Sequence, residues 1–335
     1  MYDTLRLYLN GLQPAPTQIH KSICIIPLLT VDVPSFQYLS LKTAMAQNLI
    51  TITEINQGGS VPNLKVISKA DIPVLILDGE ELKGAKQNRI LNASVLVAPH
   101  SELIVPVSCT EAGRWSYNSD AFSESGNVLP SSMRLSKMDR VSKNLEDKLG
   151  FDANQSIVWD EIQEKQSEHR VSSYSSALSD VFSHLDSDLG EAAKHFALQE
   201  NQCGIYVEMD GTYAGMDIVS LPSAWQDVHE KIVRSYVMEA INKKHDTVVC
   251  DASHYTNLLD KLPDCEYAQH KSVGLGMDIR LRNKELVGAV LEHDDSCVHI
   301  AIYPYRNMMR TKFHPPQESS NSFVEVMETY LRNRR

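Results

Sequence analysis

Several features of membrane and secreted proteins are missing from this sequence of 335 residues. It contains no run of about 18 apolar residues, the length that a membrane-spanning helix requires. Its first residues lack the basic start and the apolar stretch of a signal peptide. The six cysteines are scattered without a C-x-x-C pair, which favours reduced thiols that act as small core residues. We therefore expect a cytoplasmic protein that makes no contact with a membrane.

Basic residues are also scarce, because 32 lysines and arginines face 43 aspartates and glutamates. The formal net charge is -11, and the sequence pI is about 5.5. Binding to nucleic acid or to an anionic membrane needs a dense basic face, so this balance argues against both partners. A small anionic ligand needs only two or three well-placed cations and stays compatible with the composition.

Recognised cofactor and metal motifs are absent. The twelve histidines form no H-x-H or H-E-x-x-H pattern, and no G-x-S-x-G or phosphate-loop motif occurs. Gly274 and Gly276 lack the third glycine of a dinucleotide fingerprint. His293–Asp295 has metal-ligand side chains, but it falls where a turn is expected, and turns favour aspartate anyway. We assign no metal and no cofactor.

The order of apolar patterns predicts an α+β protein. Short alternating runs in the first part predict strands that pair antiparallel through short turns. Helical patterns dominate the centre, and hairpins with one long amphipathic helix follow. The predicted parts are an N-terminal helix (1–20), one domain (21–306) with strand-rich (21–115), helical (118–200) and mixed (203–306) zones, and a basic tail (307–335).

Three local patterns specify individual elements. The apolar run Ser22–Val31 is interrupted by Pro27, which predicts an edge strand because proline cannot donate to a neighbouring strand. Asp210 and Gly211 between two alternating runs predict a tight hairpin. An apolar stripe from Trp225 to Ala240 predicts the long helix.

The helical zone is predicted from spacing and from helix-start signals. Apolar residues recur at helical spacing through the serine-rich segment Ser167–Ser179, so we expect a helix there. Capping-box patterns begin at Asp152 and Asp188, and a third at Ser223 precedes the long helix.

The segment Asp78–Arg89 is the most polar stretch between two apolar strands. Its carboxylates, three cations and two amides are the groups that orient an anionic or polar ligand. The alternative is a solvated hairpin whose charges neutralise one another, with each exposed pair worth less than about 1 kcal/mol.

A second polar cluster, Ser108–Trp115, directly follows a predicted strand, where a rigid scaffold can hold functional groups. Arg114 and Trp115 could clamp and stack on a base or a ribose. The alternative is a strand end whose Trp115 covers the core. Cys109 could act as a nucleophile if a histidine lay nearby, but a buried structural thiol is the simpler interpretation.

Three polar residues lie beside the apolar stripe of the long helix. Lys231 and Ser235 are one turn apart and share a face, with Arg234 adjacent. This edge could face a phosphate group, or it could be an ordinary solvated helix face.

Two motifs resemble a known family. D-G-E-E-L-x-G-A-K-Q-N-R (Asp78–Arg89) and P-V-S-C-T-E-A-G-R-W (Pro106–Trp115) are similar to the family named for its association with ADP-ribosylglycohydrolases and rhodanese-phosphatase-superfamily proteins. The likeness continues through three further motifs, S-S-M-R-L (Ser131–Leu135), N-Q-S-I-V-W-D-E-I (Asn154–Ile162) and P-S-x-W…R-S-Y (Pro222–Tyr236). It spans roughly Ile23 to Tyr303. The resemblance implies a role with NAD-derived or ADP-ribose-containing molecules, and it favours a functional interpretation of both polar clusters.

Our leading hypothesis is a protein that binds or processes an ADP-ribose-like or other nucleotide-derived molecule where the two clusters meet. If it is an enzyme, hydrolysis or transfer at a glycosidic or phosphoester bond fits the paired acid and cationic groups. The expected catalytic residues are Glu81 and Glu111, and the expected ligand-binding residues are Glu80, Lys86, Gln87, Asn88, Arg89, Arg114, Trp115 and Arg234.

Two alternatives stay open. The protein could be a sensor or sponge that binds such a ligand without turnover. It could instead be an interaction module whose polar segment docks a partner enzyme. An exposed sheet edge could also pair two copies of the chain into a homo-oligomer.

Overall fold

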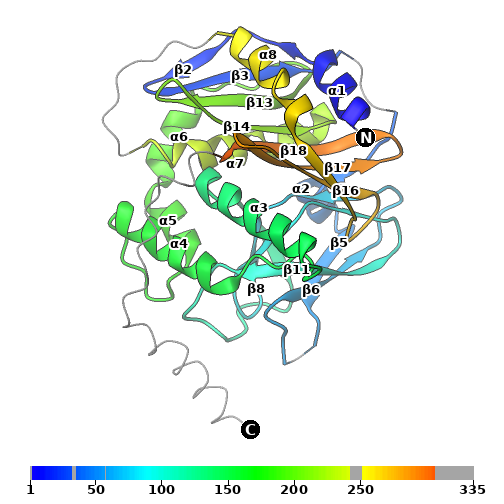
Figure 1. The fold of residues 1–335 in the computed structure, drawn as a ribbon. Helices are drawn as coiled ribbons and strands as arrows, with labels where there is room; N and C mark the ends of the chain where they lie inside the picture. The colour runs from blue at the N-terminus through cyan, green and yellow to red at the C-terminus, as the bar shows by residue number, and fades with distance from the viewer. Residues whose placement is uncertain (1, 32–34, 57, 242–250, 306–335) are drawn as a thin grey trace.

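Three β-sheets and the helices packed against them form the part of the chain that the computed structural model describes, residues 2–31, 35–56, 58–241 and 251–305 (Figure 1). Almost all strand pairs are antiparallel, the exception being one short parallel pair between β4 and β7. The predicted α+β class is therefore confirmed.

The largest sheet joins strands from both ends of the chain in the order β1-β3-β13-β14-β18-β17-β16-β15, with β2 also paired to β3. Its strands are β1 (Gln13–Pro14), β2 (Gln18–His20), β3 (Ile23–Leu29), β13 (Gln202–Met209), β14 (Thr212–Val219), β15 (Glu266–Lys271), β16 (Met277–Arg282), β17 (Leu286–His293) and β18 (Ser296–Pro304).

Helices cover both faces of this sheet (Figure 1). One face packs with α1 (Tyr2–Gly11) and α8 (Ser253–Leu259) around an apolar cluster that includes Leu5, Tyr206 and Leu258. The other face packs with α3 (Ser131–Glu146) and α7 (Pro222–Val237), and the fully buried Trp225 lies in this second cluster. The two layers give each face of the sheet its own core.

The second large sheet has the order β12-β8-β9-β11-β6-β5, and it curls until its edge strands β5 and β12 contact each other. Its inner face and the small sheet β10-β7-β4 enclose a third apolar cluster. The strands are β5 (Ile50–Glu54), β6 (Asn63–Ser68), β8 (Glu80–Gly84), β9 (Arg89–Leu91), β11 (Glu102–Cys109) and β12 (Phe122–Val128), and in the small sheet β4 (Leu39–Ser40), β7 (Val74–Ile76) and β10 (Val95–Val97).

Shorter helices complete the fold. Helix α7 lies between the largest sheet and strand β12, so it separates the two large sheets. The remaining helices are α2 (Leu41–Ala46), α4 (Gln155–Glu168), α5 (Leu178–His184), α6 (Asp186–Ala193) and the 3-10 turn η1 (Leu262–Asp264). No helix among the described residues has both the length and the apolar character needed to cross a bilayer.

The strongest local patterns formed the expected elements. The hairpin between β13 and β14 turns at Asp210 (φ 52°) and Gly211 (φ 68°), the left-handed conformation that a two-residue hairpin loop requires. The long amphipathic helix is α7, with Pro222 in its first turn. Of the predicted N-terminal helix 1–20, only Tyr2–Gly11 is helical as α1, and the strands β1 and β2 lie in the rest of that range.

The prediction that Ser22–Val31 is an edge strand is wrong. Strand β3 pairs with β13 on one side and with β2 and then β1 on the other. Pro27 falls between the β2 pairing, which ends at Ile25, and the β1 pairing, which begins at Leu28. The missing N–H group of Pro27 therefore coincides with a break between two partner strands, where no ladder hydrogen bond is lost.

The predicted helix over Ser167–Ser179 is also wrong. Helix α4 ends at Glu168 and α5 begins only at Leu178, and Tyr174 between them is fully exposed. The three capping boxes fail as well, because none of the helices near them has a side-chain cap at its start. Tertiary packing, not local capping, defines these helix ends.

Strands β8 and β12 were not predicted at all, because their sequences are polar and glycine-containing. In addition, the apolar stretch Ile90–Ala98 does not form one strand but is divided between β9 and β10. The predicted basic tail 307–335 lies outside the described residues.

The cysteines partly follow expectation. Cys109, Cys203, Cys265 and Cys297 are free and buried. Cys24 forms a disulfide bond, so the prediction of six reduced thiols does not hold for it. Cys250 lies outside the described residues.

Gly274 marks a close approach between the two halves of the fold. A Cβ atom built at this position would lie 2.2 Å from the backbone oxygen of Leu96 in β10, and the neighbouring Leu275 N–H donates to that same oxygen at 2.8 Å. Glycine is needed here because a backbone, which cannot swing away like a side chain, occupies the space.

We expect Gly274→Ala to lower the free energy of unfolding by about 1–3 kcal/mol, the usual range for a side chain forced into filled space. Urea denaturation measures this loss. Gly190→Ala is the matched control, because nothing lies near its Cβ position and a helix interior favours alanine. Equal stability of Gly274→Ala and the parent protein would contradict the close approach.

Candidate functional site

The polar segment Asp78–Arg89 folds into the hairpin of β8 and β9 and is not solvated. Eleven of its twelve residues are buried, and only Lys83 is exposed. Strand β8 lies inside its sheet between β12 and β9, so its backbone is covered on both edges. The solvated-hairpin alternative is therefore wrong.

The strand register divides these polar side chains between two faces of the sheet. Leu82 pairs with Arg89, and Glu81 pairs with Ile90. Paired residues point to one face and successive residues to opposite faces. Because Leu82 belongs to the apolar cluster inside the curled sheet, Arg89 points inward and Glu81 points outward.

Arg89 is the centre of the inward group. Its side chain is fully buried, and Nη1 donates a hydrogen bond to Gln87 Oε1 at 3.1 Å. Nη2 lies 3.7 Å from Glu54 Oε1, close enough for attraction but too far for a hydrogen bond. The guanidinium also lies 5.6 Å from the centre of the Trp115 ring, in the range of a cation–π contact.

Several polar atoms around Arg89 are buried without a hydrogen-bond partner among the described residues. They are both carboxylate oxygens of Glu54, Nε2 of Gln87, and Nε and Nη2 of Arg89. Glu54 occupies the inward position of β5 that follows Ile50 and Ile52 in the alternation. A carboxylate, an amide and a guanidinium are thus held together on the inside of the curled sheet.

Lys86 and Trp115 cover this group toward the surface. Lys86 Nζ donates to the backbone oxygen of Gly58 at 2.6 Å and lies 5.2 Å from the Trp115 ring. Trp115 is half-buried. We call Glu54, Lys86, Gln87, Arg89 and Trp115 the Arg89 cluster.

Glu111 and Arg114 bind each other and the hairpin turn. Arg114 Nε donates to both carboxylate oxygens of Glu111 at 2.9 Å, and Nη1 donates to Ala85 O at 2.7 Å. Glu111 also accepts the backbone N–H of Asn88, whose side-chain oxygen accepts from Arg114 Nη2 at 3.2 Å. These residues fasten the two predicted clusters together, and the donors of Arg114 are used within the protein.

Glu80 and Glu81 lie in separate surroundings. Glu81 accepts a hydrogen bond from Thr110 Oγ1 at 2.9 Å, and burial raises the pKa of its carboxyl group. Glu80 forms an ion pair with Lys231, which also bonds Glu124 at 2.6 Å. Burial raises the pKa of Glu80 as well, against the opposing effect of Lys231.

The solvated interpretation of the long helix is wrong for two of its three polar residues. Lys231 and Ser235 are buried, and Ser235 accepts a hydrogen bond from Arg134 at 2.9 Å. Arg234 instead contacts Asp186 of α6 and Glu230 of its own helix. The structure therefore brings Lys86, Gln87, Arg89 and Trp115 together and places Arg234 elsewhere.

Glu54 and the buried ion pairs between the sheets were not predicted from the sequence. A signal for Glu54 existed, because the alternation Ile50, Ile52, Glu54 placed its carboxylate on the apolar face. No local pattern could pair Arg134 with Asp217, since they lie on different elements and 83 residues apart.

Cys109 is a buried thiol. It pairs with Arg89 in the sheet, and burial raises the pKa of its thiol to about 11. A thiol with that pKa is protonated at neutral pH, which makes it a poor nucleophile. Among the described residues, no group of three or more histidine, cysteine, aspartate or glutamate side chains is placed to hold a metal ion.

Comparison with known proteins identifies the family. The model of the ARG and Rhodanese-Phosphatase-superfamily-associated Protein domain matches residues 11–303, a range that contains the whole Arg89 cluster. No curated protein and no solved structure matches the chain. Because the family model covers most of its length, the chain belongs to the ARG and Rhodanese-Phosphatase-superfamily-associated Protein domain family.

Proposed function

We propose that this protein binds an ADP-ribose-like, NAD-derived or other nucleotide-derived small molecule at the Arg89 cluster. One observation carries the proposal: five buried polar atoms of Glu54, Gln87 and Arg89 have no hydrogen-bond partner among the described residues. Buried polar groups in proteins are nearly always paired, and leaving one unpaired costs about 1–3 kcal/mol. Five such atoms in one place favour a polar ligand as their common partner.

The chemistry of these atoms selects the ligand class. Arg89 and Gln87 present N–H donors, which suit phosphate oxygens. Glu54 presents acceptors only, which suit the hydroxyl groups of a ribose. Arg89 and Lys86 together outweigh the charge of Glu54 by one unit, so an anionic ligand is favoured over a cationic one. A phosphorylated ribose has both required groups.

Trp115 supports the nucleotide part of the proposal. Its half-buried ring lies against Arg89 and Lys86 at the surface side of the cluster, where a base can stack on it. In this arrangement Glu54 accepts from the ribose hydroxyls. Glu81 and Glu111, the expected catalytic residues, instead bond Thr110 and, together with Arg114, hold the hairpin turn.

The test is a thermal-stability and calorimetric screen of the purified protein against NAD, ADP-ribose, AMP, ribose 5-phosphate and inorganic phosphate. A ligand at about 100 times its dissociation constant stabilises the fold by about 2.7 kcal/mol, which is a measurable shift. We expect phosphorylated ribosides to bind and Lys86→Met and Trp115→Ala to weaken them about tenfold or more, since each variant removes a ligand contact without opening the buried core.

Arg89→Met should abolish binding, and its circular dichroism shows whether the variant is folded. Lys83→Met is the matched control, because Lys83 is the exposed lysine of the same hairpin. Arg234→Ala is a second control, since Arg234 lies away from the cluster. No binding by any phosphorylated riboside, or equal binding by the Lys86, Trp115 and Lys83 variants, would reject the proposal.

Turnover separates an enzyme from a sensor. Incubation of the bound compound with the protein, followed by chromatography, shows whether a glycosidic or phosphoester bond is broken. Product formation that depends on Arg89 identifies a hydrolase or transferase. Binding without product identifies the sensor or sponge.

A further inference from the structure

A separate cavity lies on the opposite face of the largest sheet from α7. It has a volume of about 300 Å³ and lies between α8, the β13–β14 hairpin and the ends of β17 and β18. No residue of the Arg89 cluster lines it. Its size is at the lower end of the range for small-molecule sites, which suits a single-ring ligand.

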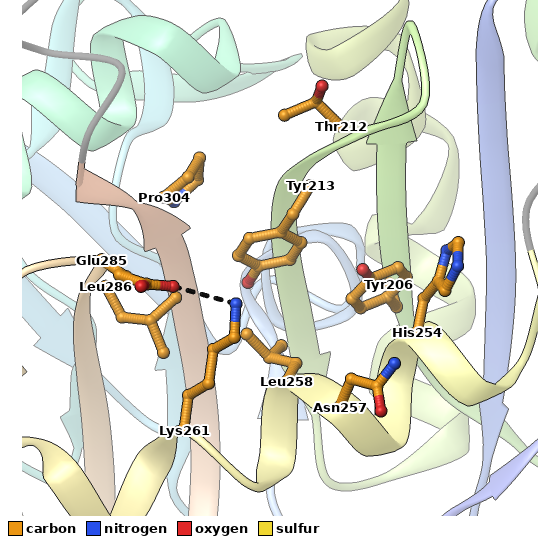
Figure 2. A pocket seen from close by; sticks show the side chains of 10 residues that line it. All are labelled: Tyr206, Thr212, Tyr213, His254, Asn257, Leu258, Lys261, Glu285, Leu286 and Pro304. Atoms are coloured by element: carbon orange, nitrogen blue, oxygen red, sulfur yellow. Dashed lines mark hydrogen bonds and ion pairs between the residues drawn. The ribbon is translucent and has the colours of Figure 1, made fainter.

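Two stacked tyrosines form a wall of the cavity. The rings of Tyr206 and Tyr213 are 5.1 Å apart at an angle of 23°. Tyr213 OH donates to Ile302 O at 2.7 Å, which fixes the ring. Figure 2 shows the Tyr213 ring among the side chains that surround the cavity. A fixed aromatic face favours a flat partner, because stacking gains contact area at little entropic cost.

A buried carboxylate orients a histidine at the cavity. Glu208 is almost fully buried, and its Oε1 accepts hydrogen bonds from Tyr206 OH at 2.9 Å and from His254 Nδ1 at 2.8 Å. A carboxylate oxygen can only accept, so the hydrogen-bond network assigns a hydrogen to Nδ1. In the neutral ring Nε2 then carries a lone pair.

The His254 side chain is 41% exposed, and Nε2 forms no hydrogen bond among the residues that the structure describes. It can therefore accept a hydrogen bond from a ligand. Glu208 holds the ring in this orientation, as second partners of functional histidines commonly do.

The rest of the lining supplies both donors and acceptors. Asn257 offers an amide from the same helix as His254, and Lys261 forms an ion pair with Glu285 at 2.9 Å across the cavity (Figure 2). The charges of this pair offset each other, so the lining favours neither a cation nor an anion. A neutral ring with polar groups on its edge matches this surface.

We propose that this cavity is a second ligand site, which takes a planar aromatic ring carrying an amino or carboxamide group. The ring stacks on Tyr213, and an N–H of the ligand donates to His254 Nε2. Nucleobases and aromatic carboxamides have this chemistry. The site does not depend on binding at the Arg89 cluster.

The experiment measures binding by saturation-transfer NMR and calorimetry with three probes: adenine, benzamide and cyclohexanecarboxamide. Benzamide and cyclohexanecarboxamide carry the same amide and differ in the planarity of the ring. We expect both planar probes to bind at millimolar or lower concentrations and the saturated probe to bind at least about tenfold more weakly. His254→Ala should weaken the planar probes about tenfold, and Tyr213→Leu should remove the preference for planarity.

Two controls keep this result interpretable. His100→Ala changes an exposed histidine elsewhere and should leave binding unchanged. Lys86→Met alters the Arg89 cluster and should also leave it unchanged, so failure at one site is distinguishable from failure at the other. No binding of either planar probe, equal binding of the saturated probe, or a folded His254→Ala variant with full affinity would overturn the proposal.

Discussion

Replacing Arg134 with methionine is expected to lower the free energy of unfolding by about 3–5 kcal/mol, the range measured when one partner of a buried ion pair is removed. Arg134 projects from α3 into the layer between the sheets. Its Nη1 donates to Asp217 of β14 at 2.5 Å, and its Nη2 donates to Ser235 of α7. One side chain thus connects three elements.

The loss is large because Asp217 cannot reach water. Its side chain is fully buried, and its second oxygen accepts a hydrogen bond from Tyr236 OH at 2.6 Å. The guanidinium also lies 5.2 Å from the Tyr236 ring. Without Arg134 the carboxylate of Asp217 loses its cationic partner and keeps Tyr236 as a neutral donor in a low-dielectric region, which is a costly state.

Urea denaturation of four proteins tests this prediction: the parent, Arg134→Met, the double variant Arg134→Met with Asp217→Asn, and Lys143→Met. The double variant should recover much of the loss, because it removes the unpaired charge together with its partner. Lys143 is the matched control on the same helix, since its side chain is 53% exposed and its buried partner Asp139 keeps a second cation, Arg282, so the loss should be less than about 1 kcal/mol. A loss below about 1 kcal/mol for Arg134→Met would contradict the role of this pair.

The second large effect is a loss of stability in acid that depends on His299. Burial lowers the pKa of this histidine to about 4. Asp217 acts in the opposite direction, and the cations Arg134 and Lys137 lower the pKa further. Nδ1 of His299 is hydrogen-bonded to Ser94 Oγ at 2.9 Å. Below about pH 6.5 the unfolded chain takes up a proton at this position and the folded chain does not. The free energy of unfolding therefore decreases as the pH is lowered from about 6.5 to about 4.

A difference of about 2.5 pKa units corresponds to a loss of about 3 kcal/mol in the free energy of unfolding. This loss is complete by about pH 4 and absent above about pH 7. Denaturation of the parent and of His299→Gln at a series of pH values measures this contribution as the difference between the two curves. His100→Gln removes an exposed histidine and should leave the pH dependence of the parent unchanged. If the parent and His299→Gln lose the same stability as the pH falls, His299 does not cause the loss of stability in acid.

The elements that sequence alone predicted well are those set by local chemistry. The β13–β14 hairpin depends on two residues that accept positive φ, and α7 depends on one continuous apolar stripe. The antiparallel α+β class followed from short strands joined by short turns. Each of these signals is complete within about twenty residues, which is why no partner element was needed to recognise it.

The elements that were predicted wrongly, or not at all, depend on partners that are distant in the sequence. Strand β8 has too many charges for a typical strand, and it exists because β12 and β9 cover its edges. Segment Ser167–Ser179 has helical spacing, but Tyr174, one of its apolar positions, is fully exposed and not buried against another element. Pro27 indicated an edge strand, but β3 lies inside the sheet because two separate strands, β1 and β2, pair with one side of it and leave a break at Pro27.

The candidate site divides in the same way. The residue types of Asp78–Arg89 and Ser108–Trp115 were sufficient to identify polar clusters and the family, since both are properties of the chain itself. Tertiary structure alone decided that Arg89 points inward with Glu54, that Glu81 points outward to Thr110, and that Lys231 of α7 reaches Glu80. The physical reason is strand pairing: the register selects the face for each side chain, and register is set by contacts between strands that lie far apart in the sequence.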